Sequence, residues 1–598
     1  MISESRFYDP ESPKFDKMND PKKFSSESIL LYLLILFLIS IPVDSFAFNP
    51  EAETDLPLLI RTFEQDQSVL NRYYNIRNSS EYFDRFERFY NDYINQMENI
   101  DFDQLPHDSQ VDFLLLKNHI HRSLYFLQSQ RTLFDEIRFL LPDLDSFMKF
   151  INDRRRGIKP DGQNVAGLFH KWSEQTESLI ASLESKEPLK RYQTVAVTEA
   201  LEEIRQALSD AHTFYYGYDI EFTWWADRPY QQLDETLETY RDLISEHFDA
   251  EAEQLDDSGI VGNPIGRDEI IKRLEFEMIA YTPQDLIDIA EHQFAKTEEE
   301  MLRASRELGF GDDWHEALEY VKNQYVEPGK KPELIHFLAD EAIAFVEERE
   351  LLTVPDLAGE VWRMQMMTPE RQLINPFFTG GEVISISYPT HTMEHDAKLM
   401  SLRGNNPHFN RATVQHELIP GHHLQGFMNR RYSTHRTPFR TPFWGEGWAL
   451  YWEMLLWDMD FAESPEDRIG MLFWRSHRYA RIIFSMNYHL GNWTPQQCID
   501  YLVERVGHEY ANAEAEVRRS FAGNYDPMYQ IAYMIGGMQI HALYKDLVET
   551  GQISAREFHD KILKEGSIPI RMVKAILQEE HLNRDTVPDW DFADYIYE

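Results

Sequence analysis

Apolar side chains that recur every three or four residues are the feature that most constrains the fold of this chain. They fill much of the sequence between residues 50 and 250, for example in SEYFDRFERFYNDYINQMENI and TLETYRDLISEHFDAEAEQL. This spacing gathers apolar side chains on one face of an α-helix, and that face must pack against other helices to leave water. A turn-rich stretch, DDSGIVGNPIG, precedes a second helical series. The sequence therefore predicts a mainly α-helical protein with a boundary near residue 260.

Two local signals mark elements of the second series. Thr282 followed by Pro283 indicates the start of a helix, because threonine caps helix N-termini and proline is tolerated at the first helical position. Strand signal is scarce, and the best candidate is GGEVISISYP at 380–389, where the alternation of side chains ends at a proline. Such a strand can bind an extended peptide by edge pairing, although it is more often plain scaffold.

The balance of charged residues excludes two classes of partner. The 598 residues include 102 acidic and 59 basic side chains, which give a formal net charge of −43. Such a surface repels nucleic acid and anionic membranes, so neither is expected as a partner. A single cysteine, Cys498, excludes an intramolecular disulfide framework and a cysteine-rich metal cluster.

The N-terminal segment has the layout of a secretory signal. ILLYLLILFLISIP at 29–42 is apolar, follows Lys22 and Lys23, and leads to Ser45 and Ala47, which resemble a small-residue cleavage site. The apolar core is shorter than the roughly 18–20 residues of a membrane span. We therefore predict a secreted or periplasmic protein with no membrane association after cleavage. The alternative is a membrane-anchored protein whose segment stays uncleaved.

The predicted signal peptide covers residues 1–47. The region before the apolar core is long for a signal, whereas a start at Met18 leaves a conventional charged leader. Residues 1–17 are therefore interpreted as a start-site artefact.

The run HELIPGHH at 416–423 nearly spells the zinc-binding pattern HExxH, but Pro420 stands where the second histidine belongs. In HExxH the two histidines lie one helical turn apart, so both imidazoles reach one ion. On a regular helix His422 turns to the wrong side, and His423 returns to the right face but about 10.5 Å along the axis. Neither histidine can share an ion with His416 on an undistorted helix.

Pro420 removes that obstacle because it cannot continue a regular helix. It has no N–H for the carbonyl of His416 and its ring clashes with that carbonyl, while Gly421 beside it is permissive. A two-residue bulge at this point brings His422 to the place that HExxH needs. His416 and His422 are then the predicted zinc ligands, with His423 as the alternative to His422. Without a metal, the run is a proline-kinked helix with surface histidines.

A third zinc ligand is expected from FWGEGWALYWE, some tens of residues downstream. Glu446 can supply it, since a carboxylate is a common zinc ligand, although a glutamate at a helix start is also a typical cap or dipole partner. Together with His416 and His422 it leaves the fourth coordination position to water. Glu417 can then face that water as general base. Glu453, two turns beyond Glu446, either orients a ligand imidazole or lies in solvent.

Four segments together carry a resemblance to a known family: HELIPGHHLQ, GEGWALYWE, ARIIFSMNYHLGNWTPQQ and YDPMYQIAYMIG. From about residue 50 to 590 the chain resembles the bacterial domain of unknown function 885 (DUF885) family, a group similar to the helical gluzincin metallopeptidases. The resemblance implies a large helical gluzincin-like (neurolysin-like) fold with a small β-sheet near the active site. It also implies Glu417 as the general base and a Zn²⁺ site formed by His416, His422 and Glu446.

The same resemblance implies two further catalytic residues, His489 in NYHLGNW and Tyr533 in YQIAYMIG. Peptide hydrolysis at zinc needs a tyrosine or histidine that donates a hydrogen bond to the developing oxyanion. Without that role, Tyr533 is a core residue of an apolar helix. The chain departs from the family pattern at Ser485, Met528 and Tyr529, which leaves the metal ligands untouched but puts substrate specificity in doubt.

The leading hypothesis is an exported zinc-dependent metallopeptidase that hydrolyses peptide bonds, with oligopeptides as substrates by analogy with related helical peptidases. Its expected segments are the signal peptide at 1–47, an N-terminal helical region at 48–260 and a C-terminal zinc-hydrolase region at 261–598. The alternatives are a non-catalytic secreted helical binding protein that keeps the gluzincin shell, and a zinc hydrolase of non-peptide amides or esters. The sequence does not distinguish amino-, carboxy- and endopeptidase action.

Recognition of a peptide terminus needs a charged anchor in the site. In WRSHRYAR, Arg475, Arg478 and Arg481 are candidates for binding a substrate carboxylate. We favour the other interpretation, in which the three arginines are ion-pair partners on a helix surface.

Overall fold

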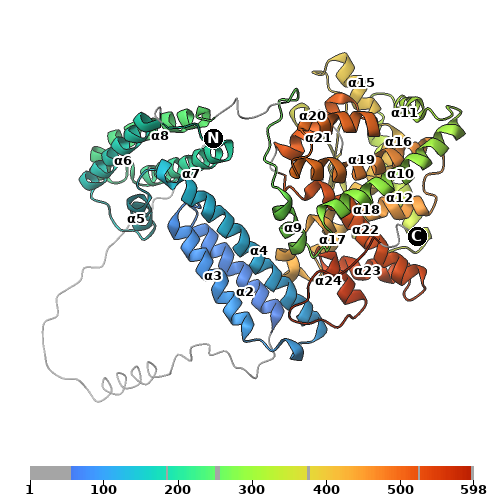
Figure 1. Ribbon diagram of the computed structural model, residues 1–598, viewed down its shortest axis with the longest axis horizontal. Coiled ribbons are helices and arrows are strands. Elements are labelled where there is room, and N and C mark those ends of the chain that lie inside the picture. Colours follow the sequence, from blue (N-terminus) through green and yellow to red (C-terminus); the bar gives the residue numbers. More distant parts are fainter. Residues whose placement is uncertain (1–54, 184–185, 249–255, 373–377, 523–524, 594–598) are drawn as a thin grey trace, which may run out of the picture. The chain divides into compact units, whose positions relative to one another are not determined.

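The described part of the protein is mainly α-helical (Figure 1) and contains one small sheet, which confirms the predicted mainly α-helical class. The gluzincin-like form of this fold stays a prediction. The structure is a computed structural model that describes residues 55–183, 186–248, 256–372, 378–522 and 525–593. The predicted signal peptide at 1–47 lies outside the described residues. Among the helices that the structure describes, none has the length and the apolar character needed to cross a membrane.

The first series of helices runs from α2 to α8, and its members pack in pairs such as α3 with α4 and α6 with α8. The predicted amphipathic helix near residue 80 is α3, and Ser79 caps it by accepting a hydrogen bond from the backbone N–H of Tyr82. The bounds are α2 Leu56–Tyr73, α3 Ser80–Glu98, α4 His107–Ile137, α5 Leu144–Arg155, α6 Gly162–Leu183, α7 Arg191–Tyr215 and α8 Ile220–Glu246, with short 3₁₀ turns at η1 Phe102–Gln104 and η2 Arg138–Leu140.

The second series begins after the turn-rich stretch near residue 260. The predicted helix start at Thr282 is confirmed, because its side chain accepts a hydrogen bond from the backbone N–H of Asp285 and Pro283 is the first helical residue. The first helices of this series are α9 Arg267–Phe276, α10 Pro283–Leu308, α11 Trp314–Lys322, α12 Lys331–Glu348, α13 Asp356–Val361, α14 Pro369–Gln372 and α15 His395–Arg403. No observation tests the predicted boundary at residue 260, which stays a prediction.

The helices that carry the candidate site follow along the chain. They are α16 Pro407–Glu417, α17 His422–Asn429, α18 Pro442–Asp458, α19 Pro465–His489, α20 Pro495–Tyr501, α21 Tyr510–Phe521, α22 Tyr529–Tyr544, α23 Ala555–Glu565 and α24 Ile570–Leu577. A 3₁₀ segment, η3 Thr434–Phe439, and two π-helical segments, η4 Leu502–Val506 and η5 Lys545–Glu549, connect them. Helix α19 packs against α10, α16 and α22, so most of its side chains are buried.

Two glycines let α18 and α22 cross in backbone contact. A Cβ added at Gly536 would lie 1.8 Å from the carbonyl oxygen of Phe443, and one added at Gly447 would lie 2.6 Å from the backbone of Gly536. Any side chain at either residue would push the helices apart. Helix α18 is otherwise filled by buried tryptophans such as Trp444 and Trp448. This crossing sets the distance between Glu446 on α18 and the tyrosines of α22.

The sheet consists of two parallel strands, β1 Arg363–Met366 and β2 Val383–Ile386. The strand predicted within 380–389 is confirmed as β2, whereas β1 was not predicted. The segment before β2 contacts the end of α16, since the backbone N–H of Gly381 donates to the carbonyl oxygen of Glu417 at 3.2 Å. The small sheet therefore lies beside the HELIPGHH run, as expected.

Candidate metal centre

The HELIPGHH run is broken into two helices. Helix α16 ends at Glu417 and α17 begins at His422, so the expected two-residue bulge is in fact a four-residue break. The backbone N–H of Gly421 donates to the carbonyl oxygen of Gln415 at 3.0 Å, which folds the break back against α16. A Cβ at Gly421 would lie 1.8 Å from the carbonyl oxygen of His416, so only glycine fits there.

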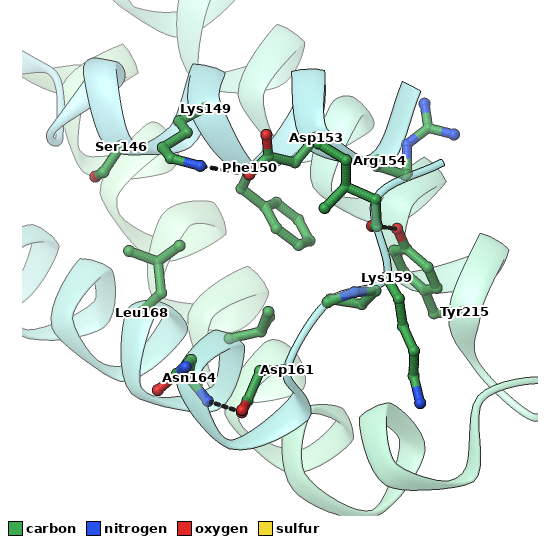
Figure 2. Close-up of a pocket in the computed structure, with 13 residues that line it drawn as sticks. Ser146, Lys149, Phe150, Asp153, Arg154, Lys159, Asp161, Asn164, Leu168 and Tyr215 are labelled. Atoms are coloured by element: carbon green, nitrogen blue, oxygen red, sulfur yellow. Dashed lines mark hydrogen bonds and ion pairs between the residues drawn. The ribbon is translucent and has the colours of Figure 1, made fainter. Parts of the chain in front are cut away.

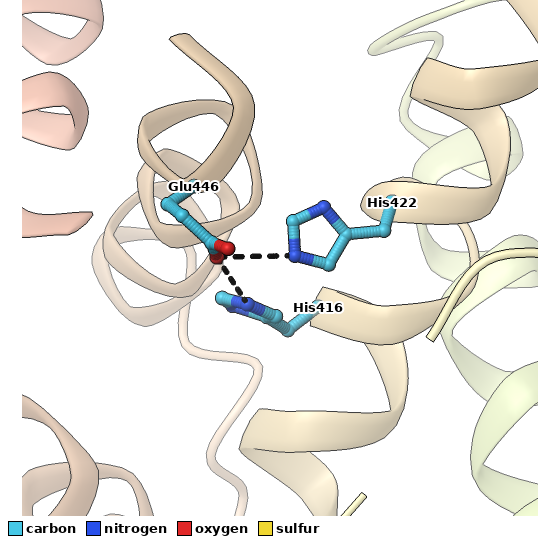
Figure 3. Close-up of side chains that lie close together, drawn as sticks. All are labelled: His416, His422 and Glu446. Atoms are coloured by element: carbon cyan, nitrogen blue, oxygen red, sulfur yellow. Dashed lines mark ion pairs between the residues drawn. The ribbon is translucent and has the colours of Figure 1, made fainter. Parts of the chain in front are cut away.

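This break brings the two histidines of the motif to one carboxylate. Nε2 of His422 lies 3.2 Å and Nε2 of His416 lies 3.8 Å from Oε2 of Glu446 (Figure 3). The ligand atoms of the three residues lie within 4.8 Å of one another. Tetrahedral zinc with ligand distances of about 2.1 Å separates its ligand atoms by roughly 3.4 Å. The two nitrogen–oxygen distances of 3.2 and 3.8 Å are close to this separation, so the carboxylate and the two imidazoles fit a zinc ion.

Hydrogen bonds fix which nitrogen each imidazole presents. Nδ1 of His416 donates to Oε1 of Glu453 at 2.7 Å, and Nδ1 of His422 donates to Oε1 of Gln425 at 3.0 Å. The amide nitrogen of Gln425 donates to the carbonyl oxygen of Gly445 at 3.0 Å, so its oxygen must face His422. Both rings therefore direct Nε2 towards Glu446, as metal-ligating histidines held by outer partners do. Glu453 is buried, so it orients a ring rather than lying in solvent.

His423, the alternative ligand, lies outside this cluster. Its ring is buried, and Nε2 donates to the carbonyl oxygen of Ala358 at 2.8 Å. Burial lowers the pKa of His423, which favours the neutral ring that this hydrogen bond needs. The structure thus brings His422, and not His423, to His416 and Glu446.

His416, His422 and Glu446 shift one another's pKa values. Burial lowers the pKa of His422, but the neighbouring Glu446 carboxylate outweighs burial and raises that pKa to about 9. The pKa of His416 is raised in the same way, with burial opposed by Glu446 and Glu453. Burial also raises the pKa of Glu446, but the two histidines hold it well below its ordinary value. The site therefore stabilises a positive charge next to a carboxylate, which is what a bound cation requires.

The cluster lies in the wall of a cavity of about 290 Å³, and Glu417 and Tyr533 line the same cavity. Glu417 directly follows His416, and its Oε2 lies so close to Gly380 that a Cβ there would meet it at 2.1 Å. The ring of Tyr533 is nearly parallel to that of His416, with 6.3 Å between their centroids. Both residues thus face the same space as the three ligand atoms.

Sequence reasoning missed two residues of this cavity, Tyr529 and Arg519, as site residues. The hydroxyl of Tyr529 donates a short hydrogen bond to Oε1 of Glu446, the carboxylate oxygen that does not face the histidines. Tyr529 was noted only as a departure from the family pattern. Its spacing of four residues from Tyr533 places both on one face of α22, and this was the available signal.

His489 does not line this cavity. Its ring is buried against Phe521 and Tyr488, and burial lowers its pKa to about 4. Its catalytic role stays a prediction that the geometry does not support, because His489 ends α19, two turns beyond Arg481, which does line the cavity.

Arg478 and Arg481 are ion-pair partners as expected, of Glu453 and Glu516, but the expectation that they lie on a helix surface is wrong. Arg478 and Arg481 are 6% and 3% exposed, and both line the cavity. Arg475 is half-buried and does not line it; its guanidinium lies over the ring of Trp457.

A larger cavity of about 390 Å³ lies between α5 and α6 (Figure 2). It is lined by apolar side chains such as Phe150 and by polar residues that pair locally, such as Lys149 with Asp153 at 2.5 Å. Among the described residues, the group of His416, His422 and Glu446 is the only set of three histidine, cysteine or acidic residues with the spacing of a metal site. The larger cavity therefore offers no comparable metal chemistry.

Residues 72–577 match the family described as "Bacterial protein of unknown function (DUF885)". The chain belongs to this family. The matched range covers most of the chain and includes His416, His422 and Glu446 and the cavity beside them. The part of the resemblance that concerns gluzincin peptidases is not shown by this match. No curated protein matches the chain.

Two solved structures share the fold of this DUF885 protein. One is described as a "putative lipoprotein of unknown function" from Shewanella oneidensis, with 16% sequence identity and a TM-score of 0.64 over 88% of this chain and 100% of that chain. The other is described as a "putative lipoprotein" from Colwellia psychrerythraea, with 15% identity and a TM-score of 0.54 over 88% of this chain and 98% of that chain. At these identities the likeness shows the fold alone.

Proposed function

We propose that this DUF885 protein is a zinc-dependent peptidase of the gluzincin type. The observation that carries the proposal is the convergence of His416, His422 and Glu446, with a free cavity on the side where Glu417 lies. Two histidines and a glutamate are a ligand set of catalytic zinc sites, which keep one coordination position open. A structural zinc site, by contrast, has four protein ligands and no open coordination position.

The chemistry divides between the ion and the residues around it. Zn²⁺ held by the three ligands would polarise a peptide carbonyl and lower the pKa of a water molecule. Glu417, next to ligand His416, accepts the proton of the attacking water and passes it to the leaving amine. Tyr529 is occupied by Glu446, so the Tyr533 hydroxyl is the better donor to the developing oxyanion. Glu453 and Gln425 hold the ligand rings in place.

Oligopeptides are the proposed substrates. The cavity is lined by polar and aromatic side chains, and its volume of about 290 Å³ admits an extended segment of chain but not a folded domain. We place the protein outside the cytoplasm, because its N-terminal segment has the layout of a secretory signal and the two similar structures are described as lipoproteins. N-terminal sequencing of the mature protein tests this location, and a chain that begins well before Phe48 contradicts signal cleavage.

The activity is tested on the purified full chain with a mixed peptide library. We expect about one zinc per chain, cleavage of peptides that a chelator abolishes, and recovery when zinc is added back. His416→Ala should lose both zinc and cleavage, whereas His170→Ala, which changes an exposed histidine far from the cluster in sequence, should keep both.

Two results contradict the proposal. A chain without zinc after metal-replete expression supports the non-catalytic binding protein. If the zinc-loaded protein cleaves esters or non-peptide amides but no peptide, the result supports the alternative of a zinc hydrolase that does not act on peptides.

A further inference from the structure

Three arginines line the cavity that the proposed zinc ligands open into. Arg478 and Arg481 come from α19, and Arg519 comes from α21. The first two are almost completely buried, and the side chain of Arg519 is 20% exposed. A buried guanidinium stays charged at any physiological pH, so it needs an anion or hydrogen-bond acceptors around it.

The described residues do not supply a hydrogen-bond acceptor for every N–H group of these three arginines. Each of the three arginines has one buried guanidinium nitrogen for which the described part of the chain offers no hydrogen-bond partner: Nε of Arg478, Nη1 of Arg481 and Nε of Arg519. A buried donor without an acceptor is costly, and native structures rarely keep several in one place without a function. Three such donors on side chains that line one cavity are consistent with a ligand that brings its own acceptor oxygens.

The charges around the three arginines agree with an anionic ligand. Glu516 is shared, since Nε of Arg481 and a terminal nitrogen of Arg519 each lie 2.7 Å from one of its oxygens. Glu453 is shared as well, since its Oε1 accepts from both Arg478 and His416. Three guanidinium groups therefore face two carboxylates, one of which also holds an imidazole. This leaves one excess positive charge on the arginine side of the cavity, in a protein of net charge −43. The other acidic residues of the lining, Glu417 and Glu446, belong to the candidate metal centre.

The ring of Tyr533 lies close to two of the guanidinium groups and to the candidate metal centre. The Cζ atoms of Arg478 and Arg481 lie 4.8 and 4.4 Å from the ring centroid of Tyr533. The same ring lies 6.3 Å from the ring of His416. About three residues of extended chain can therefore span the space between the guanidinium of Arg481 and the ring of His416.

We propose that Arg478, Arg481 and Arg519 bind the C-terminal carboxylate of the peptide, so that the protein removes short fragments from peptide C-termini. The inference rests on the proposed peptidase function for the nature of the ligand. A carboxylate supplies acceptor oxygens that match the fork of donors on arginine. Because about three residues of extended chain can span the space between Arg481 and His416, the cleaved bond lies within about three residues of the C-terminus.

The first test measures binding without hydrolysis. The full-length Glu417→Gln variant is titrated by calorimetry with an N-acetylated hexapeptide of alanine and phenylalanine. Three forms of this peptide are compared: the free C-terminal acid, the C-terminal amide, and the C-terminal amide with one internal glutamate. We expect the free acid to bind about 10- to 100-fold more tightly than either amide, as a charge-assisted pair of hydrogen bonds predicts. Equal binding of acid and amide, including no binding of either, overturns the proposal. Tight binding of the internal-glutamate amide overturns it too, in favour of a side-chain carboxylate.

The second test uses adjacent arginines of α21 as a matched pair, each in the Glu417→Gln background. Arg519→Gln should lose most of the preference for the free acid, and Arg519→Lys should lose part of it, because the charge stays but the fork is lost. Arg518→Gln makes the same chemical change at a side chain that is 48% exposed and pairs with Glu514, so it should keep the full preference. A preference that is unchanged in Arg519→Gln contradicts the assignment.

Hydrolysis by the zinc-loaded wild-type chain separates the two proposals. Cleavage of free acid and amide at equal rates keeps the peptidase and overturns the carboxylate site. Tighter binding of the free acid without any hydrolysis keeps the carboxylate site and overturns the peptidase. Mass spectrometry of the products should show released fragments of one to about three residues, and internal cuts alone contradict the inference.

Discussion

Nδ1 of His416 and Oε1 of Glu453 lie 2.7 Å apart, and both side chains are buried. Glu453 comes from the same helix as Glu446, two turns farther on, so α18 supplies both a proposed ligand and the group that orients another ligand. Outer partners of this kind raise the basicity of the imidazole and fix its orientation.

Loss of this contact should weaken zinc binding without removing a ligand. Glu453→Ala is expected to lower the affinity for zinc about 10- to 100-fold. The affinity is measured by competition with a chromophoric chelator. Glu463→Ala removes an exposed carboxylate just beyond the same helix and should change nothing. An unchanged affinity in Glu453→Ala contradicts the orienting role.

The identity of the second histidine is tested by the pair His422→Ala and His423→Ala. The first should lose zinc, because Nε2 of His422 is 3.2 Å from Oε2 of Glu446. The second should keep zinc but lose about 1–3 kcal/mol of stability, since the carbonyl oxygen of Ala358 loses a buried donor. Elemental analysis and urea unfolding measure the two effects. Zinc that survives in His422→Ala but is lost in His423→Ala would reverse the assignment.

The break between α16 and α17 depends on Gly421. Gly421→Ala should destabilise the fold by more than about 2 kcal/mol and reduce zinc binding, because its Cβ would lie 1.8 Å from the carbonyl oxygen of His416. Gly426→Ala, within α17, meets its nearest atom at 3.7 Å and should stabilise the helix by about 0.5–1 kcal/mol. Thermal unfolding compares the two variants. Equal stability of both would mean that the junction relaxes easily.

The sequence predicts the helices of this protein well, because their apolar periodicity and caps are local signals, as at Ser79 and Thr282. The effect of Pro420 on the helix also predicts that His422 joins the candidate metal cluster. The burial of Arg478 was not predictable, because a polar helix face that lines an internal cavity has the same pattern as one that faces water. Strand β1 was missed because three of its four side chains are exposed and it shows no apolar alternation.

Acid should weaken the fold through Glu516. Burial raises the pKa of this carboxyl, but Arg481 and Arg519 lower it further, to about 2. The unfolded chain has a pKa of about 4.3 and binds the proton first, so the stabilisation is complete above that pH and is lost as the pH falls towards 2. Over this window the free energy of unfolding should fall by up to about 1.4 kcal/mol per pH unit more in the wild type than in Glu516→Gln. Equal slopes in urea unfolding from pH 5 to pH 3 would contradict the pairing.

The most direct test of the central claim is the comparison of zinc content and peptide hydrolysis in the wild-type chain and in Glu417→Gln. The amide keeps the shape of the side chain, and His416, His422 and Glu446 are untouched, so zinc should stay at about one ion per chain. It cannot accept the proton of the attacking water, so the rate of peptide cleavage should fall by about 10²- to 10⁴-fold. A Glu417→Gln variant that keeps its zinc and cleaves peptides at the wild-type rate would contradict the account.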